Sequence, residues 1–329
     1  MQSQTTFIAI AILAIAVTAG MNAPAQGGAA AQSPSAPQLV ILDTDIGDDI
    51  DDAFALALLL RSSEVNLLGI STAFGDTELR ARLVDRYLQA VGRNDIPVTA
   101  GAQTLHSSKF SQEAYANQAP DREHPGSIKF LLEQIRAHPG EITLIAIGPL
   151  TNLRIAIERD PATFKKLRRV VLMGGSIYRG YDDTNVGDTN RPPSAEWNIH
   201  CDPASLRALL ASGVPVFMMP LDSTQVRPTS LELATIFAHG SALTDQLTLL
   251  YHEWTGTGAW KMPTLFDPVA AAYAIRPELC PAKPMHLDVD DQGFTRPADG
   301  PPNAQVCLKS NEKGFLDLLS RRILSDSVQ

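Results

Sequence analysis

The chain carries a group of acidic side chains close together near its start: Asp43, Asp45, Asp48, Asp49, Asp51 and Asp52. The apolar run before them, residues 38–42, predicts a buried strand, and the run after them, residues 53–61, is rich in helix-forming residues. The acidic residues therefore lie at the carboxyl end of a predicted strand. In open α/β sheets, ligands bind at that end.

Carboxylates this close together repel one another and raise each other's pKa, unless they face water or share a cation. Their hard oxygen atoms suit Ca²⁺ or Mg²⁺ better than zinc. Asp also caps helices and favours the positive end of the helix dipole, which accounts for about half of the group. We therefore expect a divalent metal ion to bind here.

The segment Asp-Thr-Asp-Ile-Gly that begins at Asp43, followed by Asp-Asp-Ala from Asp51, resembles the signature of the inosine/uridine-preferring nucleoside hydrolases in a longer form. The resemblance implies that the aspartates hold one Ca²⁺ and activate a water that attacks the sugar C1′ of an N-glycoside. It makes Asp45 a metal ligand and the general base, and Asp52 the bidentate metal ligand. Asp51 becomes the catalytic carboxylate beside the sugar hydroxyls, and Asp49 is an alternative to either of these last two.

Two later segments resemble the family where it completes the metal site. Gly148 and the Pro-Leu-Thr-Asn run after it follow an apolar strand, residues 141–147, and the resemblance makes the backbone carbonyl of Ile147 a Ca²⁺ ligand. Asp267, followed by Pro268, resembles the second metal aspartate, at the start of a helix. The implied metal ligands are therefore Asp45, Asp52, Ile147 and Asp267.

Other segments resemble the family where it binds substrate. Leu-Met-Gly-Gly implies that Met173 lies under the sugar, and Ala-Glu-Trp-Asn implies that Glu196 and Asn198 bind its outer hydroxyls, with Asn190 assisting. Glu196 and Asn198 would point to one side of an extended segment. Trp197 stands where Phe is usual, and Trp197, Trp254 and Trp260 are candidates to stack on the base.

Two positions depart from the family pattern. Asp76 stands where Asn usually touches the sugar or its water, and its alternative role is to cap the helix that follows. Phe266 stands where well-studied members place the His that protonates the departing base. This second difference leaves open how the base departs.

From residue 38 onward, predicted strands and helices alternate. This alternation predicts an open, mostly parallel, Rossmann-like sheet with helices on both faces, in a single α/β domain. Residues 284–289 and 304–308 are expected to form a small antiparallel addition near the C-terminus.

The N-terminus predicts export. The apolar run 7–17 is too short to span a bilayer and suits the core of a signal peptide, residues 1–25, with cleavage as late as residue 31. A linker (26–37) and the catalytic domain (38–329) would follow, in a periplasmic or secreted protein without a membrane span; a disordered tail is the alternative for the first residues. Export would permit a disulfide between Cys280 and Cys307, and three free thiols are the alternative.

The formal charge of −9 argues against nucleic-acid binding. The expected partner is a nucleoside or a related N-glycoside, and the expected assembly is a homo-oligomer, a dimer or a tetramer. The function predicted is Ca²⁺-dependent hydrolysis of ribonucleosides to free base and ribose. Two alternatives remain: an exported binder without catalysis, and a phosphatase of the haloacid-dehalogenase type, which would need a catalytic lysine for which the sequence offers no convincing candidate.

Overall fold

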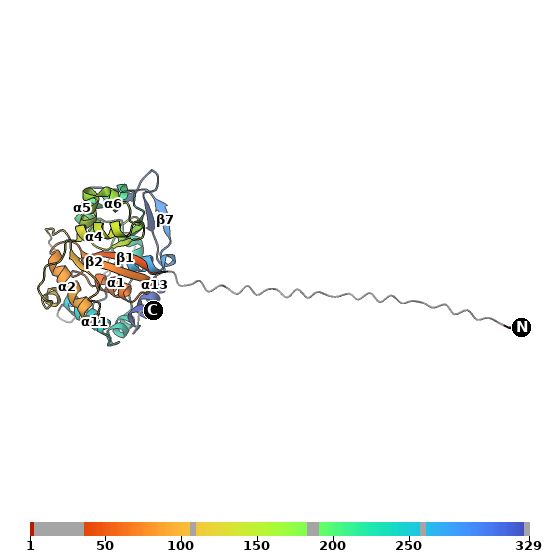
Figure 1. The fold of residues 1–329 in the computed structure, drawn as a ribbon, viewed down its shortest axis with the longest axis horizontal. Helices are drawn as coiled ribbons and strands as arrows, with labels where there is room; N and C mark the ends of the chain where they lie inside the picture. Colours follow the sequence, from red (N-terminus) through yellow and green to blue (C-terminus); the bar gives the residue numbers. More distant parts are fainter. Residues whose placement is uncertain (3–35, 106–109, 183–190, 257–260, 326–329) are drawn as a thin grey trace. The chain divides into compact units, whose positions relative to one another are not determined.

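The structure is a computed structural model that describes residues 1–2, 36–105, 110–182, 191–256 and 261–325 (Figure 1). Residues from Ala36 onward cluster as one unit. The predicted signal peptide lies outside the described residues except for its first two, and Asn190 and Trp260 lie outside them as well.

A central sheet runs through this unit and confirms the predicted architecture. Its neighbouring strands are parallel except for the last, which is antiparallel to the strand beside it. In spatial order the strands are β3 (Val98–Ala100), β2 (Val65–Thr72), β1 (Gln38–Thr44), β4 (Thr143–Ala146), β5 (Arg169–Met173), β6 (Val216–Met219), β10 (Ala304–Cys307) and β7 (Ala282–Met285).

The C-terminal strands differ in part from the prediction. β10 pairs in parallel with β6 and so extends the main sheet, because its buried residues Val306 and Cys307 are apolar and continue the core. β7 is antiparallel to β10, and β8 (Leu287–Val289) and β9 (Thr295–Pro297) form a separate antiparallel pair. The expected antiparallel pairing is therefore present between β7 and β10, which joins it to the main sheet, and β8 and β9 add a separate pair.

β1 shows why the sheet must be covered on both faces. Val40, Ile41 and Leu42 are all fully buried. Successive side chains of a strand point to opposite faces, so Val40 and Leu42 belong to one hydrophobic cluster and Ile41 to the other. A strand of this kind is stable only between two layers of helices.

The two layers are visible on either side of the sheet in Figure 1. One layer contains α1 (Asp51–Leu60), α2 (Thr77–Ala90), α10 (Ser230–Phe237), α11 (Ala242–Thr255), α12 (Asp267–Ile275) and α13 (Glu312–Ile323). The other contains α4 (Ser127–Ala137), α5 (Thr151–Arg159), α6 (Pro161–Phe164) and α8 (Pro203–Ala211). The remaining short helices are α3 (Glu113–Ala116), α7 (Trp197–Cys201), α9 (Leu221–Thr224) and η1 (Pro277–Leu279).

The strand order places a crevice between β1 and β4. The chain leaves β1 toward β2 on one side, and leaves β4 toward β5 on the other. In doubly wound folds, the carboxyl ends of two such strands border the ligand site. Asp45 follows β1 and Ile147 follows β4, so this topology brings the two residues together.

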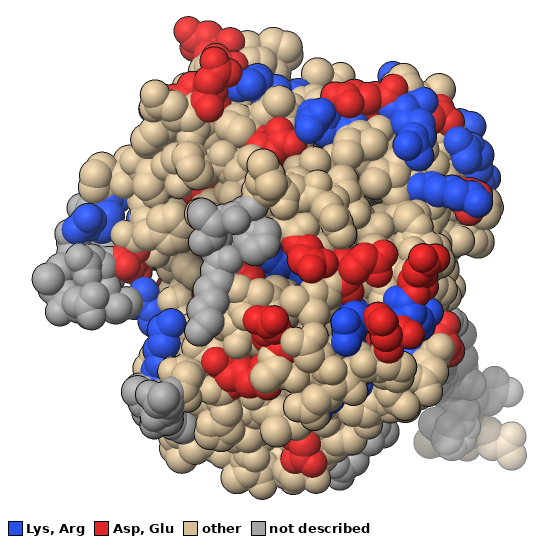
Figure 2. Space-filling view, turned by 90° about the vertical axis from the view of Figure 1, so that its left-hand side faces the viewer, with Lys and Arg blue, Asp and Glu red and all other residues tan. Residues whose placement is uncertain are grey.

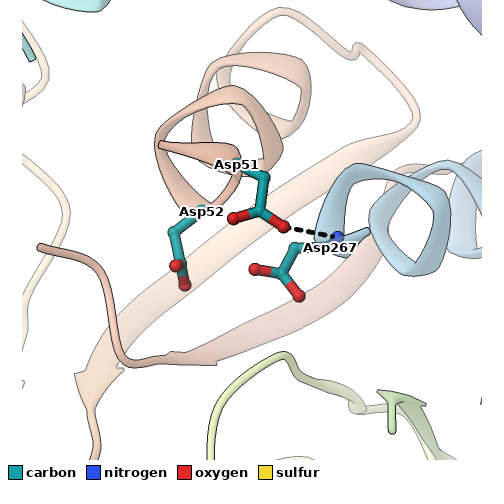
Figure 3. A group of neighbouring side chains, drawn as sticks. All are labelled: Asp51, Asp52 and Asp267. Atoms are coloured by element: carbon teal, nitrogen blue, oxygen red, sulfur yellow. Dashed lines mark hydrogen bonds between the residues drawn. The ribbon is translucent and has the colours of Figure 1, made fainter. Parts of the chain in front are cut away.

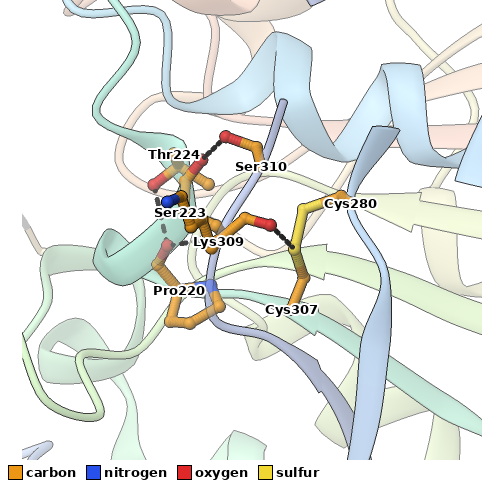
Figure 4. The surroundings of a disulfide bond; sticks show 7 residues. All are labelled: Pro220, Ser223, Thr224, Cys280, Cys307, Lys309 and Ser310. Carbon is orange, nitrogen blue, oxygen red and sulfur yellow. Dashed lines mark hydrogen bonds between the residues drawn. A yellow bond between two sulfur atoms is a disulfide. The ribbon is translucent and has the colours of Figure 1, made fainter. Parts of the chain in front are cut away.

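The predicted disulfide between Cys280 and Cys307 is present (Figure 4). It joins the residue after η1 to the last residue of β10. Nearby, the Ser310 hydroxyl donates to the carbonyl of Ser223 at 2.6 Å. The bridge lies beyond the carboxyl end of α12, the helix that begins with Asp267.

The surface facing the viewer in Figure 2 carries acidic and basic side chains interspersed among other residues. Among the described residues, no helix has the length and apolar character needed to cross a membrane.

Candidate active site

A pocket of about 410 Å³ opens at the carboxyl end of the sheet. The described residues that line it are Asp45, Asp48, Asp49, Asp51, Asp52, Ile147, Met173, Tyr181, Glu196, Trp197, Asn198, Phe266 and Asp267. A larger hollow of about 1140 Å³ borders α8 and the β8–β9 pair, and none of these residues lines it. The chemistry predicted from the sequence therefore belongs to the smaller pocket.

Three carboxylates meet on one wall of this pocket (Figure 3). Asp51 and Asp52 begin α1 and Asp267 begins α12, and each offers an oxygen atom within 4.8 Å of the others. The Asp267 backbone N–H also donates to Asp51 Oδ2 at 3.2 Å. Two helices whose positive ends converge are a favourable setting for negative charge.

Ionised carboxylates are unfavourable in this wall unless a cation neutralises them. Burial, followed by repulsion from neighbouring aspartates, raises the pKa of Asp51, Asp52 and Asp267 well above its usual range. Burial likewise raises the pKa of Asp45 to about 7, although Arg80 counteracts the shift. Several buried carboxylates with hard oxygen atoms fit a divalent ion of the Ca²⁺ or Mg²⁺ class.

The grouping differs in one respect from the set that the resemblance implied. Asp51, expected beside the sugar, belongs to the closest group of carboxylates, whereas Asp45 lines the same pocket outside that group. Asp45 approaches the turn after β4 closely: a Cβ added to Gly148 would lie 2.7 Å from Asp45 Oδ1. The Gly after Ile147 thus makes room for this carboxylate.

Asn198 connects two segments of the predicted site. Its side-chain amide donates to the carbonyl of Ile147 at 3.0 Å and to the carbonyl of Met173 at 3.2 Å. A carbonyl oxygen has two lone pairs, so that of Ile147 retains acceptor capacity for a second partner.

The predicted extended segment around Glu196 is wrong. Glu196 is the N-cap of α7, and Asn198 lies in the first turn of that helix. The Glu196 carboxylate accepts from the backbone N–H groups of Gly175 at 2.9 Å, Asn198 at 2.9 Å and Ile199 at 3.2 Å. Capping satisfies the first N–H groups of a short helix, and it still leaves Glu196 facing the pocket. Burial raises the pKa of Glu196 to about 7, with these N–H groups opposing the rise.

Tyr181 is a pocket residue that the sequence did not reveal. Its hydroxyl accepts from the Trp197 backbone N–H at 2.9 Å and lies 3.5 Å from Glu196 Oε1 as a donor. Its ring packs edge-on against Phe266, with centroids 6.0 Å apart. No motif or periodicity marks this position.

Four other predicted positions are not among the described residues that line the pocket. Asp76 is exposed and accepts from the backbone N–H of Leu79 at 3.0 Å as the N-cap of α2, and it does not line the pocket. Trp254 packs against Tyr251 and lies under the Lys261 ammonium group instead. Asn190 and Trp260 lie outside the described residues, so their predicted roles have no structural counterpart here.

Comparison with known proteins agrees with this picture. The family profile described as inosine-uridine preferring nucleoside hydrolase matches residues 40–317. The chain is 30% identical to a pyrimidine-specific ribonucleoside hydrolase, RihA, of Citrobacter koseri, covering 86% of this chain and 97% of that protein. It is 28% identical to uridine nucleosidase 1 of Arabidopsis thaliana, covering 78% and 79%.

Two solved structures have the same fold. A plant nucleoside hydrolase superposes with a TM-score of 0.76 at 25% identity, covering 88% of this chain and 99% of that one. A purine-preferring ribonucleoside hydrolase from Gardnerella vaginalis superposes with a TM-score of 0.73 at 23% identity, covering 87% and 98%.

Proposed function

Because this chain belongs to the inosine-uridine preferring nucleoside hydrolase family and is a hydrolase of N-glycosyl compounds, we propose that it splits ribonucleosides with the help of Ca²⁺ and Asp45. The products are the free base and ribose. The observation that carries this proposal is the meeting of Asp51, Asp52 and Asp267 in one buried group beside an aromatic wall.

The ligands proposed for the ion are Asp45, Asp52, Asp267 and the carbonyl of Ile147, with Asp51 joining them because it lies in the closest group. Asp49, which lines the same pocket, stays an alternative ligand. Bound Ca²⁺ would fix the sugar's 2′ and 3′ hydroxyls and orient the attacking water.

The chain's own side chains supply the remaining steps. Asp45 accepts the proton of the attacking water, which requires its ionised form. Glu196 and Asn198 hold the sugar hydroxyls, and Met173 packs below the ring. Trp197, 39% exposed, offers an aromatic surface to the base.

Phe266 shapes the expected substrate range. Its ring lines the pocket and cannot donate a proton to the departing base. We therefore expect the enzyme to act fastest on glycosides whose leaving group needs no protonation, such as p-nitrophenyl riboside. Both pyrimidine and purine nucleosides are candidate substrates, since the relatives include proteins named as pyrimidine-specific and as purine-preferring.

A panel of nucleosides and p-nitrophenyl riboside, assayed for released sugar, tests the proposal. The protein is treated with EGTA, desalted, and assayed alone, with Ca²⁺ and with Mg²⁺. We expect activity that disappears on chelation and returns with Ca²⁺. Activity that survives complete chelation would contradict the role proposed for the ion.

Phe266 also supports a second candidate, an exported binder without catalysis. Calorimetry with the same compounds in calcium buffer separates the two candidates. Tight binding with no sugar released from any compound would favour the binder.

We propose export of the chain on the basis of its apolar N-terminal run; fractionation of expressing cells would test this.

A further inference from the structure

Arg80, on α2, is fully buried behind the turn that carries the first aspartates. A buried guanidinium is costly unless its N–H groups and its charge are satisfied. Neither the family signature nor the pocket lining includes this residue.

The guanidinium binds the turn between β1 and α1 at three points. Nη1 donates to the backbone carbonyls of Asp45 and of Ile46, the second at 3.0 Å. Nη2 forms an ion pair with Asp48 Oδ2 at 3.0 Å. One side chain thus fixes the main chain of the proposed general base together with a carboxylate from the extended part of the signature.

Further contacts hold the same guanidinium in place. Nε donates to the carbonyl of Phe74 at 2.7 Å, and the group lies over the rings of Phe74 and Phe110, 5.9 and 5.1 Å from their centroids. Phe74 has a positive φ of 66°, a strained conformation for a non-glycine residue that directs its carbonyl into this contact. Arg80 is therefore preorganised, with a fixed orientation toward the turn.

Arg80 also joins the two walls of the pocket. The Phe74 ring packs edge-on against Trp197, with centroids 5.9 Å apart. Arg80 thus contacts the aspartate turn directly and the aromatic wall through Phe74.

We propose that Arg80 is a positioning residue that holds the turn from Asp45 to Asp48 in the geometry required for binding the divalent ion. This inference rests on the proposed function, because it assumes an ion bound by that turn. Arg80 acts through backbone carbonyls and Asp48, without touching the substrate. Groups that orient metal ligands in this way typically contribute about 10- to 100-fold to metal affinity.

Calorimetric titration of the EGTA-treated full-length chain with Ca²⁺ tests the proposal. We expect Arg80→Met to weaken Ca²⁺ binding about 10- to 100-fold. Arg80→Lys should fall in between, because its ammonium keeps the charge near Asp48 but lacks the planar set of donors. The matched control is Arg86→Met on the same helix, since Arg86 donates to the carbonyl of Tyr115 and should leave the affinity unchanged.

A double variant distinguishes positioning from a general loss of structure. If Arg80 acts partly through Asp48, the loss of Ca²⁺ affinity in Arg80→Met combined with Asp48→Asn should be smaller than the product of the two single losses. Equal affinities for wild type, Arg80→Met and Arg86→Met would overturn the proposal. Equal losses of Ca²⁺ affinity in Arg80→Met and Arg86→Met would also overturn it.

If Arg80→Met does not fold, Arg80→Lys and Asp48→Asn carry the test, and wild-type affinity in both would overturn the proposal. Failure of the wild-type chain to bind any divalent ion would instead refute the proposed function and remove the premise of this inference. The two failures are therefore distinguishable.

Discussion

Asp52 and Asp267 lie far apart in the sequence, and their carboxylates meet in one buried group. We expect Ala at either position to abolish turnover and to weaken Ca²⁺ binding by more than the roughly 100-fold typical of indirect contacts. Calorimetry and the sugar-release assay measure the two effects. Asp288→Ala, at an exposed acid on β8, is the control.

The isosteric change Asp267→Asn should increase the stability of the chelated protein. Burial, followed by repulsion from four neighbouring aspartates, makes the charged form of Asp267 unfavourable in the chain without an ion. Removing that charge should raise the Tm of the chelated protein by a few degrees, since about 1 kcal/mol corresponds to roughly 2–4 °C in a domain of this size. A lower Tm for the chelated variant would contradict this electrostatic account.

The sequence predicted a pocket residue where a motif gives that residue a fixed role, as for Asp52, Asn198 and Asp267. It did not predict Tyr181, because a loop residue outside any motif reaches the pocket only through the path that the loop takes. Asp76 shows another limit. A carboxylate before a helix can cap it or face a ligand, and the orientation of α2 decides between these roles.

Elements were predicted well where burial alone determines them. The apolar run of β1 predicted a central strand, and the alternation of elements predicted the parallel sheet. The prediction of an extended segment after Ala195 was wrong, because α7 is too short for its helical periodicity to be recognised in the sequence. The parallel pairing of β10 with β6 was not predicted, because it depends on packing against a strand distant in the sequence, which the local sequence does not encode.

At the level of elements, Gly47 determines the shape of the aspartate turn. Its φ is +129°, and an added Cβ would lie 2.1 Å from the Phe110 ring. Gly47→Ala should therefore lower the free energy of unfolding by roughly 2–5 kcal/mol, from backbone strain and overpacking together. Chemical denaturation measures this loss.

Two further variants separate backbone strain from overpacking as causes of the stability loss in Gly47→Ala. Gly92 also has a positive φ, of +72°, but open space around it, so Gly92→Ala reports conformational strain without a clash. Adding Phe110→Ala to Gly47→Ala should relieve the clash alone. If Gly47→Ala and Gly92→Ala cost the same, the contact with Phe110 is unimportant.

At the level of the whole molecule, the Cys280–Cys307 bridge closes a loop with a sequence separation of 27 residues. The chain-entropy model assigns such a loop about 3–4 kcal/mol. Replacing both cysteines with Ala should lower the Tm by roughly 5–15 °C. Activity at 25 °C should persist, because the bridge lies beyond the end of α12 opposite to Asp267.

Cys201→Ala is the control, because Cys201 is the free cysteine of the described chain. Thiol titration of the denatured, unreduced protein checks the pairing directly. One reactive thiol is expected, and three would contradict the bridge.

The ion should also change how stability depends on pH. The folded-state pKa of Asp45 is about 7, against an ordinary value of 3.8, so folding favours its protonated form. In the chelated protein, the stabilisation from this group is complete below about pH 4 and is lost as the pH rises through about 7. Because Ca²⁺ binds the ionised carboxylates, the gap in Tm between calcium-bound and chelated protein should widen from pH 5 to pH 8.

Thermal melting at fixed calcium concentration measures this gap. Asp267→Asn serves as the control, in which the gap should stay small at every pH. A wild-type gap that stays constant or narrows as the pH rises would contradict the linkage.

Every residue of α1 and α12 is buried, so the acidic wall of the pocket is also part of the hydrophobic core. Tyr181 and Trp197, which also line the pocket, come from a connecting loop and the start of a short helix. We therefore expect Tyr181 and Trp197 to tolerate substitution better than the aspartates that begin α1 and α12. Libraries randomised at Tyr181 and Trp197 should yield clones with altered base selectivity and intact folding, whereas libraries in the first turns of α1 and α12 should consist mainly of inactive clones.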